Sequence, residues 1–142
     1  MDTTKFRHLN QRVKLRLAKF EFEHLGEMNS WLRARDVLPS PMDDLPAIGY
    51  IVKHEDKIIA TAFLRRIEGN IGLFDGLATN PKMASEIRHH AIELLIKKVF
   101  KIAKESGINK MIAYSKDNSI FERAEIHGFT KTPFVLLTKE IE

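Results

Sequence analysis

One carboxylate, Asp75, stands where it could take part in proton transfer. It lies in an apolar run between Phe74 and Gly76. Partial burial in such a run would favour a carboxyl group that takes up a proton near neutral pH, as a general base must. The alternative is structural, an Asp near the end of a strand that pairs with a nearby Lys or Arg. The sequence leaves both roles open.

The six histidines show no spacing typical of a metal site. His89 and His90 are adjacent, so on a helix their side chains would point about 100° apart, whereas helical ligand pairs usually stand four residues apart. His127 precedes Gly128 and is expected near a helix C-terminus, where partial positive charge is favourable. The other three have no partner pattern: His8, His24 and His54. Since the chain also lacks cysteine, the sequence predicts no metal site.

The composition is typical of a folded protein. The chain has 142 residues, of which 44% are hydrophobic and 30% charged, so we expect a single domain over 1–142 with a flexible segment over 1–12. The N-terminus lacks the apolar stretch of a secretory signal, and no segment approaches the ~20 apolar residues needed to span a bilayer. Together with the absence of cysteine, this favours a cytoplasmic protein with no membrane partner.

The formal charge of +4 and the sequence pI of about 9.4 mildly favour anionic ligands. Lysines on one side of the segment 97–104 could meet the phosphates of a nucleic acid. No helix-turn-helix, aromatic stacking motif or zinc spacing accompanies them, and lysines on one side of a helix usually only solvate it. We therefore do not expect a nucleic-acid partner.

Hydrophobic periodicity predicts nine elements of secondary structure. In chain order they are a strand over 13–18, a helix over 21–35, strands over 47–52, 58–67 and 71–79, a helix over 85–106, a strand over 109–115, a short helix over 119–126 and a strand over 133–141. The three consecutive strands are joined by short polar turns, which favours an antiparallel meander, since parallel strands need long crossovers. The sequence thus predicts a mixed α/β domain with a mostly antiparallel, twisted sheet of about six strands flanked by helices.

Two short stretches carry a resemblance to a known family. DGLATNP (75–81) ends an apolar strand with an x-Pro step before a long helix. DNSIFERAEIHGF (117–129) holds an Asn-containing turn, a short helix and a closing Gly-Phe. With the order of the elements, they resemble the GCN5-related N-acetyltransferase (GNAT) superfamily over about 13–141. The resemblance implies a GNAT-like fold and acetyl-CoA as co-substrate.

In that family, acetyl-CoA lies where the fourth and fifth strands splay apart. The resemblance implies that the backbone of Leu77, Ala78 and Thr79 pairs with the pantetheine arm. The start of the following helix would surround the pyrophosphate, using the N–H groups that a helix N-terminus leaves free. The residues concerned are Ser85, Glu86, Ile87, Arg88, His89, His90 and Ala91. Asn118 would hydrogen-bond the pantetheine arm, or instead cap the short helix.

The pyrophosphate loop departs from the family's pattern, Gln/Arg-x-x-Gly-x-Gly/Ala. No glycine occurs between Gly76 and Gly107, and no register restores the motif. Glycine serves there because the backbone must approach phosphate closely, and Glu86 would add an anion. Arg88 and the two histidines after it could supply positive charge instead. The sequence leaves open whether this loop still binds acetyl-CoA.

The resemblance implies transfer of an acetyl group to an amine of a small molecule or peptide. Since no cysteine can carry the acetyl group, attack would be direct, within a ternary complex. Asp75 would be the base. Ala124 stands where the family's usual acid, a tyrosine, is found, so Tyr114 would serve instead, unless it is a core residue with a solvated hydroxyl. The acceptor pocket is expected along the first helix, the loop over 37–46 and the last strand pair.

A second function of a different class also fits the sequence. The chain would then be a GNAT-fold protein that has lost catalysis and serves as a binding or structural module of a larger assembly. The missing tyrosine and the missing loop glycines favour this alternative when they are taken together. Whether the chain forms a homo-oligomer stays open.

Overall fold

The computed structural model describes residues 14–115 and 118–141. The chain divides into two compact units. The first unit ends at Ile112 and the second begins at Ala113. The expected flexible segment over 1–12 lies outside the described residues. A single domain over the whole chain stays a prediction.

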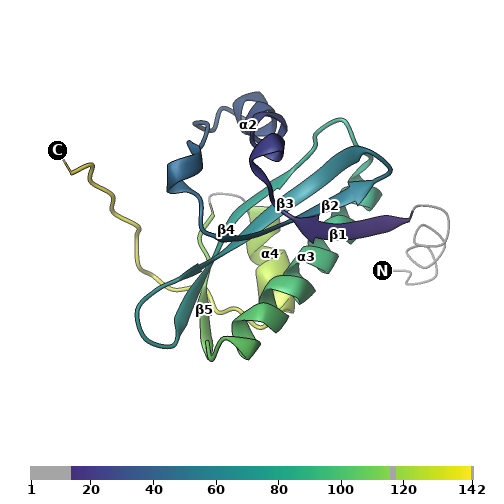
Figure 1. Ribbon diagram of the computed structural model, residues 1–142. Helices are drawn as coiled ribbons and strands as arrows, with labels where there is room; N and C mark the ends of the chain where they lie inside the picture. The colour runs from purple at the N-terminus through teal and green to yellow at the C-terminus, as the bar shows by residue number, and fades with distance from the viewer. Residues whose placement is uncertain (1–13, 116–117, 142) are drawn as a thin grey trace. The chain divides into compact units, whose positions relative to one another are not determined.

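The first unit is built on one twisted sheet (Figure 1). Its strands lie side by side in chain order: β1 (Leu15–Lys19), β2 (Ile48–His54), β3 (Lys57–Arg66), β4 (Ile71–Thr79) and β5 (Lys110–Ile112). The pairs from β1 to β4 are antiparallel, whereas β5 is parallel to β4. The predicted mixed α/β fold with a mostly antiparallel sheet is confirmed, with five strands instead of about six.

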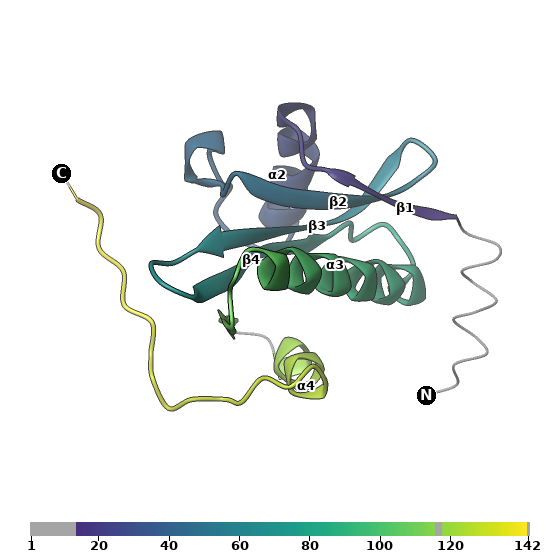
Figure 2. The ribbon, with the colours of Figure 1, turned by 60° about the horizontal axis from the view of Figure 1, so that its bottom comes forward.

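Helices cover both faces of this sheet (Figure 2). A 3-10 turn, η1 (Phe22–His24), leads into α2 (Leu25–Ala34), a second turn, η2 (Met42–Asp44), precedes β2, and α3 (Ser85–Glu105) follows β4. In Figure 2, α2 lies on one side of the sheet and α3 on the other. Each helix packs in its own cluster of buried side chains. None of the helices in the described ranges is long and apolar enough to cross a membrane.

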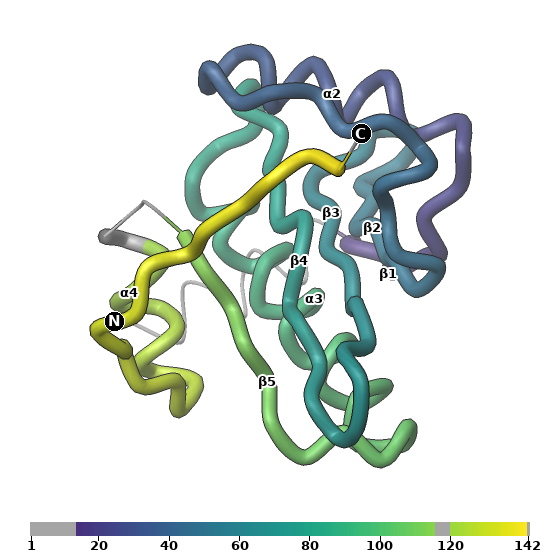
Figure 3. The backbone as a smooth tube through the Cα atoms, turned by 90° about the vertical axis from the view of Figure 1, so that its left-hand side faces the viewer, coloured from purple at the N-terminus to yellow at the C-terminus, as the bar shows by residue number. Residues whose placement is uncertain are grey.

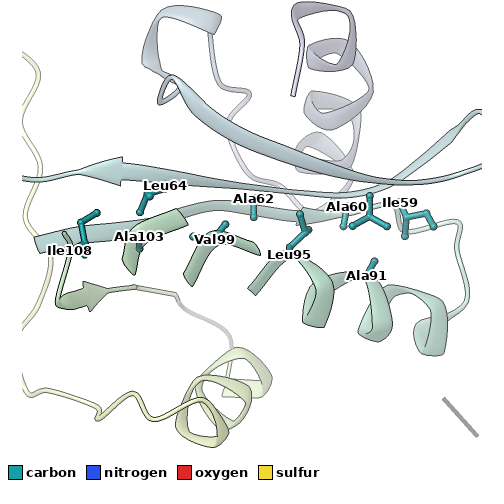
Figure 4. Close-up of a cluster of buried hydrophobic side chains, with 10 residues drawn as sticks. Ile59, Ala60, Ala62, Leu64, Ala91, Leu95, Val99, Ala103 and Ile108 are labelled. Carbon is teal, nitrogen blue, oxygen red and sulfur yellow. The ribbon is translucent and has the colours of Figure 1, made fainter. Parts of the chain in front are cut away.

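The apolar stripe of α3 fixes this helix on the sheet. Ala91, Leu95, Val99 and Ala103 recur every fourth residue and are buried (Figure 4). Because an α-helix has 3.6 residues per turn, this spacing places them on one face. They pack against side chains of β3 that include Ile59, Ala60, Ala62 and Leu64. This packing fixes α3, whose start is separated from the end of β4 by the five residues 80–84.

The second unit contains α4 (Asn118–Ile126). The helix closes at Gly128, whose φ is 90°, and the Phe129 N–H donates to the Ala124 carbonyl oxygen at 3.0 Å. This is a common helix ending, in which a left-handed glycine lets the chain turn back. The predicted short helix with its closing Gly-Phe is confirmed.

The last two predicted strands differ from the structure. Residues 129–141 contain neither helix nor strand, and five of their apolar side chains are exposed. These side chains are Phe134, Val135, Leu136, Leu137 and Ile141. The apolar pattern favours a strand, but a strand also needs a neighbour for its backbone hydrogen bonds, and no described strand pairs with this segment. The predicted buried strand over 109–115 is only β5, at the sheet edge, where Lys110 and Ile112 are exposed.

Candidate functional site

β4 carries a β-bulge at Gly76. Between Asp75 and Ala78 the strand has one residue more than β3 opposite it. Gly76 has a φ of 62°, and Thr61 Oγ1 donates a hydrogen bond to its carbonyl oxygen at 3.0 Å. A Cβ at this position would lie 2.5 Å from the ring of Phe63, so glycine is required. The bulge redirects the last residues of the strand.

One edge of β4 has no strand beside it along most of its length. β5 pairs with β4 only at Ile71, Gly72 and Leu73 (Figure 3). In the described part of the chain, no other strand pairs with this edge over 74–79. The backbone groups of an open strand edge can pair with an extended ligand that carries amides. The predicted pantetheine-binding residues, 77–79, lie on this stretch.

An arginine that the sequence analysis missed binds the end of β4. Arg35, just after α2, donates from Nη1 to the Thr79 carbonyl oxygen at 2.7 Å and from Nη2 to Thr79 Oγ1 at 3.0 Å. Its Nη1 also lies 3.4 Å from the Trp31 carbonyl oxygen. Partial burial of its guanidinium, and then the positive charge of Arg88, lower the pKa of Arg35, although the residue as a whole is exposed. The contact joins residues 44 positions apart, and no local pattern could have found it.

Asn80 builds the turn between β4 and α3. This buried residue donates from its N–H to the Ile59 carbonyl oxygen at 2.8 Å and from Nδ2 to that of Ile58 at 3.2 Å. Its Oδ1 accepts from the Lys82 N–H at 3.0 Å, and its carbonyl oxygen from the Met83 N–H at 3.2 Å. An Asn side chain that bonds the backbone two residues on is a turn former. The chain therefore reverses here without a glycine.

α3 begins without a side-chain cap. Its N-cap residue is Ala84, and the Arg88 N–H donates to the Ala84 carbonyl oxygen at 3.1 Å. The backbone N–H groups of the three residues between them have no carbonyl of the same helix to bind. Of these residues Ser85 is exposed, whereas Glu86 and Ile87 are half-buried. The helix start therefore presents N–H donors and partial positive charge, which suit an anion.

The other predicted pyrophosphate residues differ in burial and charge. Ala91 has no exposed surface and seats α3 on the sheet. Arg88 is half-buried, and its Nε is buried without a hydrogen-bond partner in the described ranges. Burial, and then the charge of Lys97, lower the pKa of His90 and so disfavour its charged form. His89 is half-buried. Arg88 is thus the permanent cation of this group.

Asp75 is bound on both of its carboxylate oxygens. Oδ1 accepts the Gly76 N–H at 2.8 Å, and Oδ2 lies 3.4 Å from Arg65 Nε. Arg65 also donates to the Asp44 carbonyl oxygen at 2.6 Å, which ties η2 to the sheet. The structural role considered from the sequence, pairing with an arginine, is therefore present. A role of Asp75 as base stays a prediction.

A groove of about 340 Å³ opens beside this ion pair. It lies where the loop after η2 enters β2 and where β3 ends. Its lining residues are Leu45, Pro46, Ala47, Ile48, Leu64, Arg65 and Arg66. The loop over 37–46, in which the sequence predicts part of an acceptor pocket, thus contributes to this groove.

Two predicted site residues belong to the second unit. The side chain of Tyr114 is 55% exposed, so it is not the core tyrosine considered as the alternative. Asn118 begins α4, but its side chain lies outside the described residues. The roles of Tyr114 as acid and of Asn118 as a pantetheine ligand stay predictions.

His24, which shows no partner pattern in the sequence, has a structural place. Its ring is buried and its Nδ1 accepts the Glu21 N–H at 2.9 Å, which fixes the start of η1. The ring of Phe20 packs edge-on against it. Burial, and then the charge of Lys53, lower the pKa of His24. Among the residues that the structure describes, no group of three or more His, Cys, Asp or Glu could hold a metal ion.

Comparison with known proteins gives similarity in structure but not in sequence. No protein-family model matches the chain, and a search of curated proteins finds no match. An acetyltransferase of Trypanosoma brucei is similar with a TM-score of 0.67 at 15% identity, over 89% of this chain and 100% of that one. Rv2747 of Mycobacterium tuberculosis, in complex with CoA, gives 0.63 at 12% identity, over 87% and 76%. AAC(6')-Iy in complex with a CoA-containing bisubstrate analogue gives 0.62 at 18%, over 90% and 99%.

These similarities establish the fold. The similarity to the Trypanosoma brucei acetyltransferase and to AAC(6')-Iy extends over 89% and 90% of this chain. The chain has the GNAT fold, as its resemblance to that superfamily implies.

Proposed function

We propose that this chain is an N-acetyltransferase that moves an acetyl group from acetyl-CoA to an amine. The observation that carries this proposal is the open edge of β4 over 74–79, which leads directly to the uncapped start of α3. The amides of a pantetheine arm would pair with this edge, and the pyrophosphate would then meet the N–H groups at the start of the helix. Similar structures that contain CoA or a CoA analogue support this assignment.

The reaction would be direct attack within a ternary complex. The amine nitrogen forms a bond to the thioester carbonyl carbon, the C–S bond breaks, and CoA leaves as a thiolate. A base must take the proton that the amine loses, and an acid must protonate the thiolate. We assign these roles to Asp75 and Tyr114. Asp75 would exchange its Oδ2 contact with Arg65 for the amine.

The acceptor is an amine of a small molecule or peptide. The groove beside Arg65 is our candidate for its entry, because Arg65, which lines it, also pairs with the carboxylate of Asp75. Its lining residues are largely apolar and include two arginines. An acceptor with an apolar body would fit such walls.

Titration of acetyl-CoA into the purified protein tests the proposal. We expect saturable heat by calorimetry and a rise in melting temperature. Arg88→Ala should weaken binding by about tenfold or more, because a charge-assisted hydrogen bond is lost. Lys101→Ala is the matched control, since Lys101 is an exposed cation on the same helix. Absence of binding at millimolar acetyl-CoA would contradict the proposal.

Turnover tests the assignment of Asp75. An acceptor amine is first found by measuring thiol release from acetyl-CoA. With that acceptor, Asp75→Asn should lower kcat by roughly 10²- to 10⁴-fold. The amide oxygen of Asn can still accept the Gly76 N–H, so the fold should survive. Asp56→Asn, at an exposed position of the β2–β3 turn, is the control. Unchanged turnover in Asp75→Asn would exclude Asp75 as the base.

The second candidate is a GNAT-fold binding or structural module without catalysis. Two observations favour it: both oxygens of Asp75 are bound, and Ala124 replaces the tyrosine that the family uses as acid. In that case no amine in a broad panel would cause the release of free CoA thiol from acetyl-CoA, whether or not the protein binds acetyl-CoA. Thiol release above the rate of hydrolysis with any amine would exclude this candidate.

A further inference from the structure

Arg35 is fixed at the end of β4 with part of its hydrogen-bonding capacity unused. A guanidinium carries five N–H donors, and three of them bind Thr79 and the Trp31 carbonyl oxygen. The other two have no partner among the described residues. The residue is exposed, so its charge can be reached from solvent. The side chain is therefore both held in place and able to bind a further acceptor.

A second cation stands at the other end of the same loop. Arg35 binds the residue before the loop over 80–84, and Arg88 lies in the first turn of α3 after it. In the described ranges neither arginine forms an ion pair with a carboxylate, and Arg88 Nε is buried without a partner. Burial, and then the positive charge of Arg88, lower the pKa of Arg35. Two like charges with no carboxylate paired to them in the described ranges repel each other, and an anion between them removes this repulsion.

We propose that Arg35 is a phosphate-binding residue of the acyl-CoA site, which binds the pyrophosphate of CoA together with Arg88. This inference rests on the proposed function and adds a residue from a different element to its site. The guanidinium fork binds two phosphate oxygens at once. The long arginine side chain can also reach an anion that the side chains of the loop keep away from the backbone. The arginine pair thus explains how a loop without glycine can hold a pyrophosphate.

The proposal predicts a preference for thioesters that carry phosphate. The backbone of β4 would bind the pantetheine arm in any pantetheine thioester, whereas Arg35 would recognise only the phosphates. Arg35 would therefore determine specificity for CoA over unphosphorylated pantetheine. Its contact with Thr79 would hold the guanidinium at the right distance along the arm.

Affinities of Arg35 variants for three probes test this inference. The probes are CoA, pantetheine and inorganic pyrophosphate, measured by calorimetry at one salt concentration. We expect Arg35→Ala to weaken CoA and pyrophosphate roughly ten- to a hundredfold and to leave pantetheine unchanged. Arg35→Gln should do the same, because it keeps a donor for Thr79 but lacks the charge. Arg33→Ala, an exposed cation in the last turn of α2, should change none of the three.

The outcomes separate this inference from the proposed function. Equal weakening of CoA and pantetheine would mean that Arg35 only supports β4, and would overturn the inference, as would unchanged CoA affinity. Pyrophosphate binding that depends on Arg35, in a protein that does not bind CoA, would remove the proposed function but keep the anion site. A protein that binds neither CoA nor pyrophosphate would overturn both.

Discussion

Phe63 is held between two glycines on the neighbouring strands. Gly49 of β2 and Gly76 of β4 both lie against its ring, and a side chain at either position would collide with it. Phe20 meets the same ring edge-on, with 4.9 Å between centroids. The glycine that bends β4 therefore also makes room for the largest fully buried side chain of the fold. Site geometry and core packing depend on the same residue.

Replacement of Gly76 by Ala tests this dependence. We expect a loss of about 2–4 kcal/mol in the free energy of unfolding, from the left-handed φ and from overpacking against Phe63. Gly26→Ala in α2 is the control, since a Cβ there meets nothing within 4 Å. That variant should be neutral or more stable by up to about 1 kcal/mol. Urea denaturation of both variants measures the difference.

Equal stability of the two variants would show that the bulge tolerates a side chain. In that case the stability of the fold would not depend on glycine at position 76. Loss of acetyl-CoA affinity in Gly76→Ala with retained folding would instead link the bulge to the open edge of β4.

At the residue scale, local patterns predict only part of the site. The strand exit over 77–79 and the buried stripe of α3 are predicted because each depends on neighbours in the chain. The contact of Arg35 with Thr79 is set by how α2 packs on the sheet, and no local spacing encodes it. The sequence predicts that Asp75 could pair with a Lys or Arg. That the partner is Arg65 follows only from the register of β3 and β4.

At the scale of elements, the short turn η1 depends on a histidine that must stay neutral. His24 accepts the Glu21 N–H through Nδ1, and its buried Nε2 has no hydrogen-bond partner in the described chain but lies 3.6 Å from Glu23 Oε1. Protonation would place a charge in this buried position. Because the folded state lowers the pKa of His24, the unfolded chain binds a proton first as the pH falls.

Stability should therefore fall when the pH is lowered below the ordinary histidine value of about 6.5. The contribution is fully present above that pH and is lost as the pH falls through the lowered pKa of the folded state. His90, whose pKa is also lowered by burial, adds to the effect. The free energy of unfolding, measured in urea between about pH 7.5 and 5, should decrease with a slope that reports these groups.

His24→Asn is the informative variant for this pH dependence. Its side-chain oxygen can still accept the Glu21 N–H, but it does not titrate. The slope should become shallower in this variant, and shallower again when His90→Asn is added. A slope identical to that of the unmodified protein would mean that His24 is not the group responsible.

Element order is predicted better than element length. Periodicity identifies which residues of a segment are apolar, and this suffices for β2, β3, β4 and α3 because their partners are adjacent in the chain. It does not identify a partner for an edge strand. The segment over 109–115 therefore shortens to β5, and the segment over 133–141 forms no strand.

At the scale of the whole molecule, the binding features and the proposed acid fall in different units. The open edge of β4, the Asn80 turn, Arg35 and Arg88 all belong to the unit that ends at Ile112, whereas Tyr114 lies in the second unit. The buried side chains of both clusters also come from the first unit alone. The stability of the first unit should therefore not depend on residues near the end of the chain.

A chain that ends at Thr132 tests this independence. The removed segment exposes apolar side chains, among them Phe134 and Leu137, so its loss gives up little buried surface. We expect the melting temperature to change by no more than about 2 °C and self-association to decrease, because an exposed apolar stretch is removed. Calorimetry and sedimentation velocity measure the two effects. The full-length double variant Phe134→Ser, Leu137→Ser is the matched control and should behave in the same way. A fall of more than about 5 °C in both proteins would mean that the segment pairs with a sheet, as its apolar pattern predicts.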